Sequence, residues 1–381
     1  MHTSALLYEY VDINPKEIIP KGKIAKKISM DKLQPFCRDI SNYELAEFSG
    51  GAKFRNGDTI MARITPCLEN GKTSMVNILE QDEIGFGSTE FIVFRAKEGY
   101  TIPDFVYYLV KSSIIREPAI KSMVGSSGRQ RVQTDVIQNL RIQFPSLEEQ
   151  EKIVSILKAF DDKINLNNEI NNNLEQQAQA IYQKMFIENA SSDWKEGFLS
   201  DVADITMGQS PSGSSYNEDG IGTIFFQGRA EFGFRFPSIR LFTTEPKRMA
   251  RANDTLMSVR APVGDLNVAH TDCCIGRGLA AIHSKTNHQS FVHYTMLSLK
   301  KQLDVFNGEG TVFGSINRNS LNEMSIIIPS DEILDKFESL VSPMDKVIRN
   351  NYNEICRLEA IRDSLLPKLM SGELDISNIN I

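Results

Sequence analysis

Two segments of the chain carry apolar residues at alternating spacings of four and three positions. This pattern is typical of a long amphipathic helix with a narrow apolar seam. The first seam runs from Ile153 to Met185 and the second from Phe337 to Leu369. A helix over Leu147–Phe186 would extend about 60 Å at 1.5 Å per residue. Neither helix can bury its seam alone, so we expect the two helices to pack against each other.

Three residues in the seams bear on how the helices pack. Asn167 and Asn351 occupy the same position in the two copies. A buried asparagine would fix the helix register at a cost in stability. A solvated asparagine in an asparagine-rich turn is equally compatible with the sequence. Pro343 lies within the second seam, and it predicts that the second helix starts or kinks there.

The two segments that precede the helices are copies of each other. Arg55–Met61 recurs as Arg251–Met257 at an offset of 196 residues, and later in each copy the offset becomes 184 and holds without a gap. The chain therefore reads as a globular segment and a helical segment, repeated once. The predicted domains are 1–145 (globular), 146–190 (helical), 191–330 (globular) and 331–381 (helical).

Short apolar runs separated by loops rich in Gly, Ser and Asn predict strands in the globular segments. The predicted strands are Glu90–Phe94, Leu140–Phe144, Thr223–Phe226, Leu256–Val259 and Ser325–Ile328. Phe105–Val110 and Phe291–Leu303 predict helices at matching places. We therefore expect an α+β fold with a pseudo-twofold internal repeat, in which two long helices join two globular domains.

Charge is distributed unevenly along the 381 residues. The chain has 42 Lys+Arg and 49 Asp+Glu, and its net charge of −7 argues against indiscriminate binding of polyanions. Each helical segment carries a net charge of −4, whereas residues 1–145 carry +2 and 191–330 carry −1. The five cysteines are scattered and predict a reducing cytoplasm rather than disulfides. No run approaches the roughly 18 apolar residues of a membrane span.

No motif specifies a reaction. Gly71-Lys72-Thr73 resembles the end of a phosphate-binding loop, but Pro66 stands where the first glycine is required. Four histidines within 24 residues match no zinc spacing; they are His270, His283, His288 and His293. We therefore expect no catalytic residue, no metal site and no cofactor.

The polar residues of the globular segments suit a polyanion instead. Guanidinium and amide groups can bond phosphate oxygens and the edges of purine bases. A single arginine or lysine is usually a solvated surface charge, so it is the clustering of such residues that favours binding. The candidate DNA-binding residues are Lys23, Lys26, Lys27, Arg55, Arg129, Gln130, Arg131, Gln209, Gln227, Arg229, Arg235 and Arg251.

Three runs resemble one protein family. Phe144–Val154, continuing through Phe160–Ile164, resembles the first central region of Type I restriction-modification specificity (S) subunits. Leu365–Glu373 resembles the distal end of the second central region, and Trp194–Pro211 resembles the start of a target recognition domain. The second helix departs from the pattern, because Pro329-Ser330-Asp331-Glu332 lacks the Glu-Gln pair of the first.

This resemblance covers essentially the full chain and implies a function. Each globular segment would be a target recognition domain that reads one half of a split, asymmetric sequence in double-stranded DNA. The helices would pack antiparallel as a spacer and dock methyltransferase (M) subunits, with restriction/translocase (R) subunits as further partners. We interpret the chain as a non-catalytic specificity subunit. The rival interpretation is a coiled-coil scaffold that joins proteins without touching DNA, and salt-insensitive or absent DNA binding would favour that rival.

Overall fold

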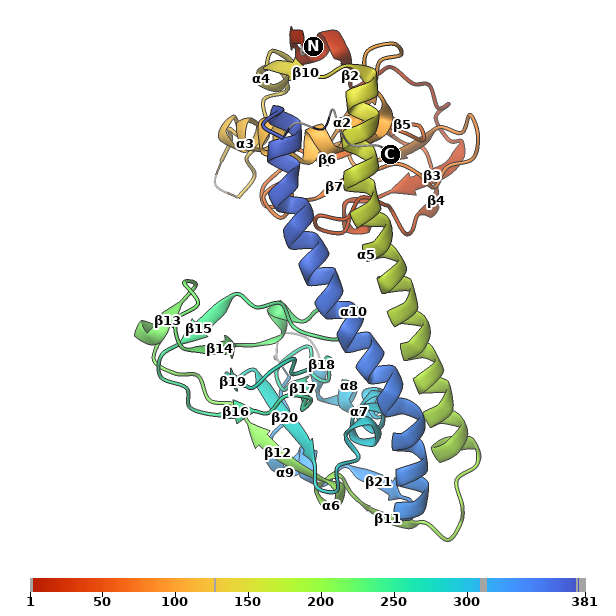
Figure 1. Cartoon of the computed structure of the whole chain (residues 1–381). Helices are drawn as coiled ribbons and strands as arrows, with labels where there is room; N and C mark the ends of the chain where they lie inside the picture. Colours follow the sequence, from red (N-terminus) through yellow and green to blue (C-terminus); the bar gives the residue numbers. More distant parts are fainter. Residues whose placement is uncertain (1–2, 127, 309–313, 375, 377–381) are drawn as a thin grey trace. The chain divides into compact units, whose positions relative to one another are not determined.

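The computed structural model describes residues 3–126, 128–308, 314–374 and 376 of the chain (Figure 1). Its contacts divide the chain into two compact units. The first unit comprises Met1–Leu166 with Glu354–Ile381, and the second unit comprises Asn167–Asn353. Each unit therefore combines one globular domain with the end of one long helix and the beginning of the other.

The first unit is built from two four-stranded sheets, one separate strand pair and four short helices among its described residues, around a core of its own. Its strands and helices are β1 (Thr3–Leu6), α1 (Leu7–Tyr10), β2 (Val11–Ile13), β3 (Ile24–Ile28), β4 (Glu44–Glu47), β5 (Lys53–Phe54), β6 (Thr59–Ala62), β7 (Thr73–Met75), β8 (Gly85–Gly87), β9 (Phe91–Ala96), α2 (Pro103–Lys111), α3 (Ser113–Lys121), α4 (Thr134–Gln138) and β10 (Arg141–Phe144). One sheet has the antiparallel order β2-β9-β6-β7. The other has the order β4-β3-β8-β5, in which β3 and β8 run parallel, and β1 pairs separately with β10.

The second unit repeats this topology. Its elements are β11 (Lys195–Phe198), α6 (Leu199–Val202), β12 (Ala203–Met207), β13 (Tyr216–Asn217), β14 (Thr223–Phe226), β15 (Leu241–Thr243), β16 (Met249–Ala250), β17 (Thr255–Ser258), β18 (Leu266–Val268), β19 (Cys273–Ile275), β20 (Leu279–Ser284), α7 (Gln289–Ser298), α8 (Lys300–Asp304), α9 (Arg318–Asn322) and β21 (Ser325–Ile328). The sheets are β12-β20-β17-β18 and β13-β15-β14-β19-β16, with β14 and β19 parallel, and β11 pairs with β21. The α+β fold and the internal repeat are confirmed.

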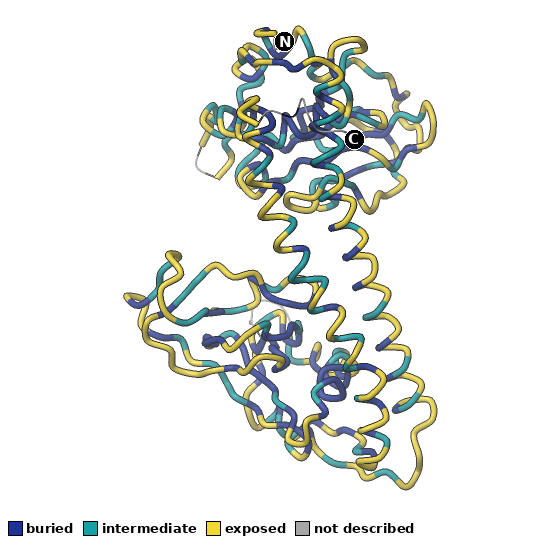
Figure 2. Tube along the Cα trace, in the orientation of Figure 1, coloured by how far each residue is buried: buried dark blue, intermediate teal, exposed yellow. Residues whose placement is uncertain are grey.

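The elements predicted from the sequence are all present, with shifts at their ends. Glu90–Phe94 corresponds to β9, and the predicted helix Phe291–Leu303 is divided between α7 and α8. Strand β9, which is apolar on both faces, is buried at Phe91–Phe94. Figure 2 shows buried positions gathered inside each globular domain. Pro103 stands in the first turn of α2, where a missing backbone N–H costs nothing.

The long helix α5 (Leu147–Tyr182) begins with a reciprocal cap. The Ser146 backbone N–H donates to Glu149 Oε2 at 2.8 Å, and the Glu149 N–H donates to Ser146 Oγ at 3.3 Å. The buried Gln150 side chain accepts from the Ile102 N–H (3.1 Å) and donates to the carbonyl of Tyr100 (2.9 Å), so it ties the start of α5 to the loop before α2. The Glu-Gln pair of the sequence is therefore a capping and anchoring device.

The second long helix, α10 (Asp331–Ser371), begins without that pair. At an offset of 184 residues, Gln150 corresponds to Leu334, which is buried in the apolar core of the second unit. An apolar contact there replaces the amide hydrogen bonds of the first copy. Of the two alternatives predicted for Pro343, a helix start was wrong, since α10 begins twelve residues earlier and continues past it; a kink there stays a prediction. Buried Val341 and Ile348 on either side of the proline supply packing that offsets its missing hydrogen bond.

Within each unit the two long helices run antiparallel and complete the domain core. In the first unit, Ile153 and Leu157 of α5 lie in one apolar cluster with Leu366 and Leu369 of α10. In the second unit, α5 ends in a π-helical turn (Gln183–Glu188), and the rings of Tyr182 and Phe186 contact that of Phe337 from α10, at centroid distances of 5.9 and 5.0 Å.

The asparagines of the seam lie at the ends of the helical parts of the second unit. Asn167 is almost fully buried, and the side chain of Asn351 donates to Oδ1 of buried Asn171 at 2.9 Å. The direct partner of Asn351 is thus one helical turn beyond Asn167. A role of Asn167 and Asn351 in fixing the helix register stays a prediction.

A buried ion pair joins the two helices in the first unit. The Arg362 guanidinium donates to Asp161 Oδ1 at 2.6 Å, both side chains are 4% exposed, and the Tyr108 hydroxyl donates to the other carboxylate oxygen at 2.7 Å. Nearby, Lys163 and Glu354 form an exposed pair at 3.5 Å between the same helices. The two pairs have the same charge chemistry and differ in burial.

We predict that Arg362→Met lowers the free energy of unfolding by about 3–5 kcal/mol, because it leaves Asp161 buried without its cation. The matched variant Lys163→Met removes an exposed pair and should cost at most about 1 kcal/mol. Chemical denaturation of both full-length variants measures the difference. Equal losses for the two variants would contradict the role assigned to the buried pair.

Candidate nucleic-acid interface

Three glycines of the second unit bring four strand ends into close contact; we call Gly208, Gly276 and Gly278 the glycine junction. The Gly208 N–H donates to the carbonyl of Leu279, and the Gly276 N–H donates to that of Phe226, at 2.9 and 2.8 Å. A Cβ added to Gly208 would lie 2.1 Å from the Gly276 carbonyl oxygen. Since no side chain fits there, glycine is required for the backbones to approach this closely.

Exposed amide and guanidinium groups surround the glycine junction. Gln209 follows β12, Gln227 follows β14, Arg277 stands between two of the glycines, and Arg260 follows a residue whose N–H donates to Gly278. Within the described parts of the chain, none of these four side chains has a hydrogen-bond or ion-pair partner. Such groups can bond phosphates and base edges. Their freedom from internal partners makes the junction the strongest candidate contact surface of this unit.

The first unit has the corresponding parallel strand pair, but its junction has a serine in place of Gly276 and different side chains around it. Ile28 pairs with Gly87 as Phe226 pairs with Ile275, so Ser29 and Ser88 take the places of Gln227 and Gly276. A cavity of about 420 Å³ lies there. Its polar lining includes Lys27, Ser29, Asp31, Glu47, Ser49 and Ser88. Hydroxyl and carboxylate groups dominate this junction, whereas amides and guanidiniums dominate the other.

The loop Gly125–Arg131 is anchored beside the first junction. Arg131 forms a bidentate ion pair with Glu90, with its shortest contact at 2.7 Å, and these hydrogen bonds lower the pKa of Glu90. The Gln130 carbonyl accepts the N–H of Thr65 at 3.1 Å. Arg129 is exposed, and the described residues offer its side chain no partner. Val124, just before the loop, is also hydrogen-bonded to Arg131, so Arg129 is an exposed guanidinium beside anchored residues.

The repeat aligns this loop with residues at the second junction. Ile64 bridges to Arg131 as Arg260 bridges to Ser315, so Arg131 corresponds to Ser315. By sequence alone, Thr311–Phe313 is the matching place of Arg129–Arg131 in the second copy, and the bridges shift this alignment by two positions. Thr311–Phe313 themselves lie outside the described residues.

Five other candidates have partners inside the protein. Lys27 pairs with Glu44 (2.8 Å), Arg55 with Glu17 (2.6 Å), Arg229 with Asp265 (2.5 Å), and Arg251 lies 3.3 Å from His283 Nε2; all four remain at least partly exposed. Lys26 is a correction. It is buried, and its ammonium contacts Glu80 and Glu83 at 3.2 and 3.0 Å, so it is not available to DNA. Lys23 is exposed and, like Arg129, lacks a partner in the described structure.

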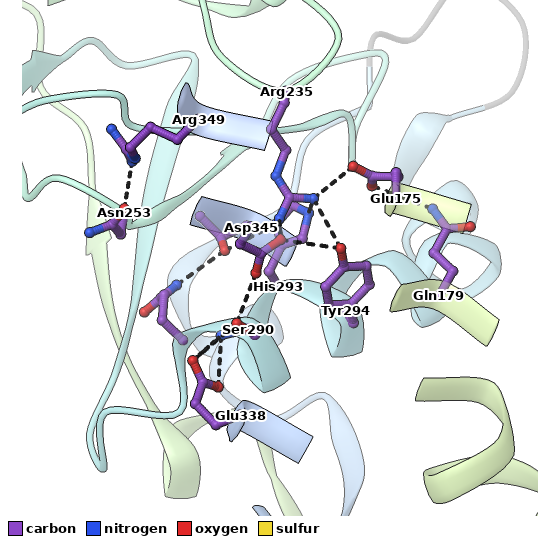
Figure 3. A network of polar contacts seen from close by, with 12 residues as sticks. Glu175, Gln179, Arg235, Asn253, Ser290, His293, Tyr294, Glu338, Asp345 and Arg349 are labelled. Carbon is purple, nitrogen blue, oxygen red and sulfur yellow. Dashed lines mark hydrogen bonds and ion pairs between the residues drawn. The ribbon is translucent and has the colours of Figure 1, made fainter. Parts of the chain in front are cut away.

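Arg235 is the second correction. Its side chain is 6% exposed and lies in a polar network between the domain and both long helices (Figure 3). The guanidinium donates to Glu175 of α5 at 2.8 Å and to Asp345 of α10 at 2.5 Å. It also donates to His293 Nε2 at 2.8 Å, so that nitrogen is an acceptor and the imidazole is neutral. Burial, together with the Arg235 charge, lowers the pKa of His293 well below its ordinary value.

Sequence reasoning missed Arg277 among its candidates. The signal that could have found it is the glycine on either side, because a long cation flanked by glycines has space around it and a closely packed backbone beneath it. Among the described residues, no three His, Cys, Asp or Glu side chains are placed to hold a metal ion, and no helix is long and apolar enough to cross a membrane. The vicinal Cys273 and Cys274 are buried free thiols of β19.

The chain is thus a duplicated α+β domain with exposed polar groups at a strand junction in each copy. The family described as "Type I restriction modification DNA specificity domain" matches residues 9–176 and 191–357, once for each copy. The chain belongs to this family. It is a specificity subunit of a Type I restriction-modification system, which recognises DNA and is not a catalytic subunit.

Specificity subunits from other organisms match this chain over most of their own length. The putative type I restriction enzyme MjaX specificity subunit of Methanocaldococcus jannaschii is 28% identical over 371 residues, 92% of this chain and 85% of the relative. The HindI specificity subunit of Haemophilus influenzae is 25% identical over 440 residues, 88% of this chain and 90% of the relative. The crystal structure of a Type I S subunit from M. genitalium shares the fold, with a TM-score of 0.58 at 16% identity over 99% of this chain and 97% of that one.

We predict that Arg277→Ala weakens DNA binding and reduces the slope of log K against log salt by about 1, because one phosphate or base contact is lost. Arg240→Ala is the control, since Arg240 is exposed but already paired with Glu218 and Glu231. Binding of the full-length variants to target DNA across a salt series measures both. Equal effects of the two substitutions would show that the glycine junction is not the surface that contacts DNA.

Proposed function

We propose that this specificity subunit reads a split, asymmetric DNA sequence, with residues 1–145 reading one half and residues 191–330 reading the other. The observation that carries the proposal is the difference between the two junctions. Gln227 and Arg277 at one offer purine-reading groups, while the other offers Ser29, Ser88 and carboxylates that accept from cytosine. Two domains that share one backbone fold but expose different side chains suit a target whose two halves differ.

We also propose that the helical segments position partner enzymes, which are methyltransferase subunits and restriction/translocase subunits. The seam residues of α5 and α10 pack against other residues within the two units. Both helices still expose apolar side chains on other faces, namely Leu166 and Ile170 of α5 and Val347 and Ile361 of α10. Exposed apolar side chains of this kind are places where another protein could pack.

Replacing residues 1–145 by the matching domain of a relative tests the assignment of one domain to each half. We predict that one half of the methylated sequence changes and the other half is retained, since the domain at 191–330 is untouched. The reciprocal replacement of residues 191–330 should change the opposite half. Sequencing of methylated bases in host DNA reads both outcomes. A change of both halves in either chimera would show that the domains do not read independently.

A further inference from the structure

The internal repeat allows buried groups of the two units to be compared position by position. The carbonyl of Arg38 accepts the N–H of Met75 at the end of β7, and the carbonyl of Arg235 accepts the N–H of Val268 at the end of β18, both at 2.8 Å. Arg38 and Arg235 are therefore equivalent residues. At the offset of 184, Asp161 of α5 is likewise equivalent to Asp345 of α10.

The equivalent aspartates receive the same hydroxyl but different cations. The Tyr108 hydroxyl donates to Asp161 at 2.7 Å, and the matching Tyr294 hydroxyl donates to Asp345 at 3.4 Å. In the first unit the cation is Arg362, which comes from the other long helix. The position on α5 that matches Arg362 is Ala178, which has no charge to offer. The second unit therefore cannot form that helix-to-helix pair.

The globular domain of the second unit supplies the missing cation. Arg235 reaches Asp345 of α10 and Glu175 of α5 at once, and its guanidinium lies 5.5 Å from the ring centroid of Tyr294 of α7 (Figure 3). Its counterpart Arg38 pairs instead with Asp39 and Asp104, both in its own domain. A single side chain thus ties the second domain to both helices, and the equivalent residue of the first domain does not.

Arg235 also lies on the segment that leads away from the glycine junction. Residues 227–240 connect β14 to β15, and this segment starts with the exposed Gln227. The carbonyl of Arg235 is hydrogen-bonded to β18, so the backbone and the side chain of one residue fix the segment to the sheet and to the helices. Arg235 stands eight residues after Gln227 on the same segment, so its contacts constrain the course of the backbone that leads from the junction.

We propose that Arg235 is a positioning residue, which holds the DNA-reading segment 227–240 against α5 and α10 and thereby sets the selectivity of the second domain for its half-site. This inference rests on the proposed function, because it assumes that each domain reads one half. Arg235 acts through the segment and does not touch DNA. In the first domain the equivalent arginine is linked to α5 only through Asp39, whose Oδ2 accepts from the Asn165 side chain at 2.7 Å. The first domain's selectivity therefore does not depend on a direct contact of Arg38 with the helices.

The test measures half-site selectivity of the full-length chain by competition binding. Each duplex carries the matched target or one substituted base pair in either half, and the half read by the second domain is the one retained when residues 1–145 are replaced. We expect Arg235→Met to reduce discrimination in that half by about tenfold, the size of one typical mismatch penalty, and to leave discrimination in the other half unchanged. Arg235→Lys, which keeps the charge, should restore part of it.

Two further variants keep the test decisive. Asp345→Asn is nearly isosteric and should reduce discrimination in the same half if Arg235→Met does not fold. Arg38→Met is the matched control and should leave discrimination in the second domain's half unchanged. Loss of discrimination in both halves equally, or in neither, would overturn the inference. If the wild-type chain itself discriminates in neither half, the proposed function fails; if it discriminates and the variants behave like it, only the role of Arg235 fails.

Discussion

Burial of the apolar seams of the two long helices is the constraint on which the rest of the structure depends. A helix of this length cannot hide such a seam by itself, and each globular domain is too small to cover it. Each unit solves this with the beginning of one helix and the end of the other. Ile153 and Leu157 share a core with Leu366 and Leu369, although about 200 residues separate them in sequence. The C-terminal helix is thereby part of the core of the first domain.

The same arrangement separates the conserved scaffold of the repeat from its variable surfaces. The paired sheets, the parallel strand pairs β3–β8 and β14–β19, and the helices α2 and α7 recur in both units. The residues that follow the parallel strands do not recur, as Ser29 and Gln227 show. A scaffold that fixes the backbone at a crowded junction can exchange the exposed side chains around it at little cost in stability. This division suits the proposed reading of two different half-sites.

Much of this fold could be predicted from sequence, because its signals are local or periodic. The alternating spacing of four and three residues predicted both long helices. The recurrence of Arg55–Met61 marked equivalent turns in the two copies. In these turns the Arg55 N–H donates to Asp58 at 2.7 Å, and the Arg251 N–H donates to Asp254 at 2.8 Å. The roles of Lys26 and Arg235 could not be predicted. Their carboxylate partners lie 54 to 110 residues away, and a basic residue looks the same in sequence whether it faces solvent or a buried acid.

The central claim is that one chain carries two different DNA readers. Sequencing of methylated adenines in host DNA, with and without the gene for this chain, tests it most directly. The account predicts that removal of the gene abolishes methylation at one motif, and that this motif consists of two unlike specified halves separated by a gap of fixed length. A contiguous or palindromic motif, or methylation that is unchanged without the gene, would contradict it.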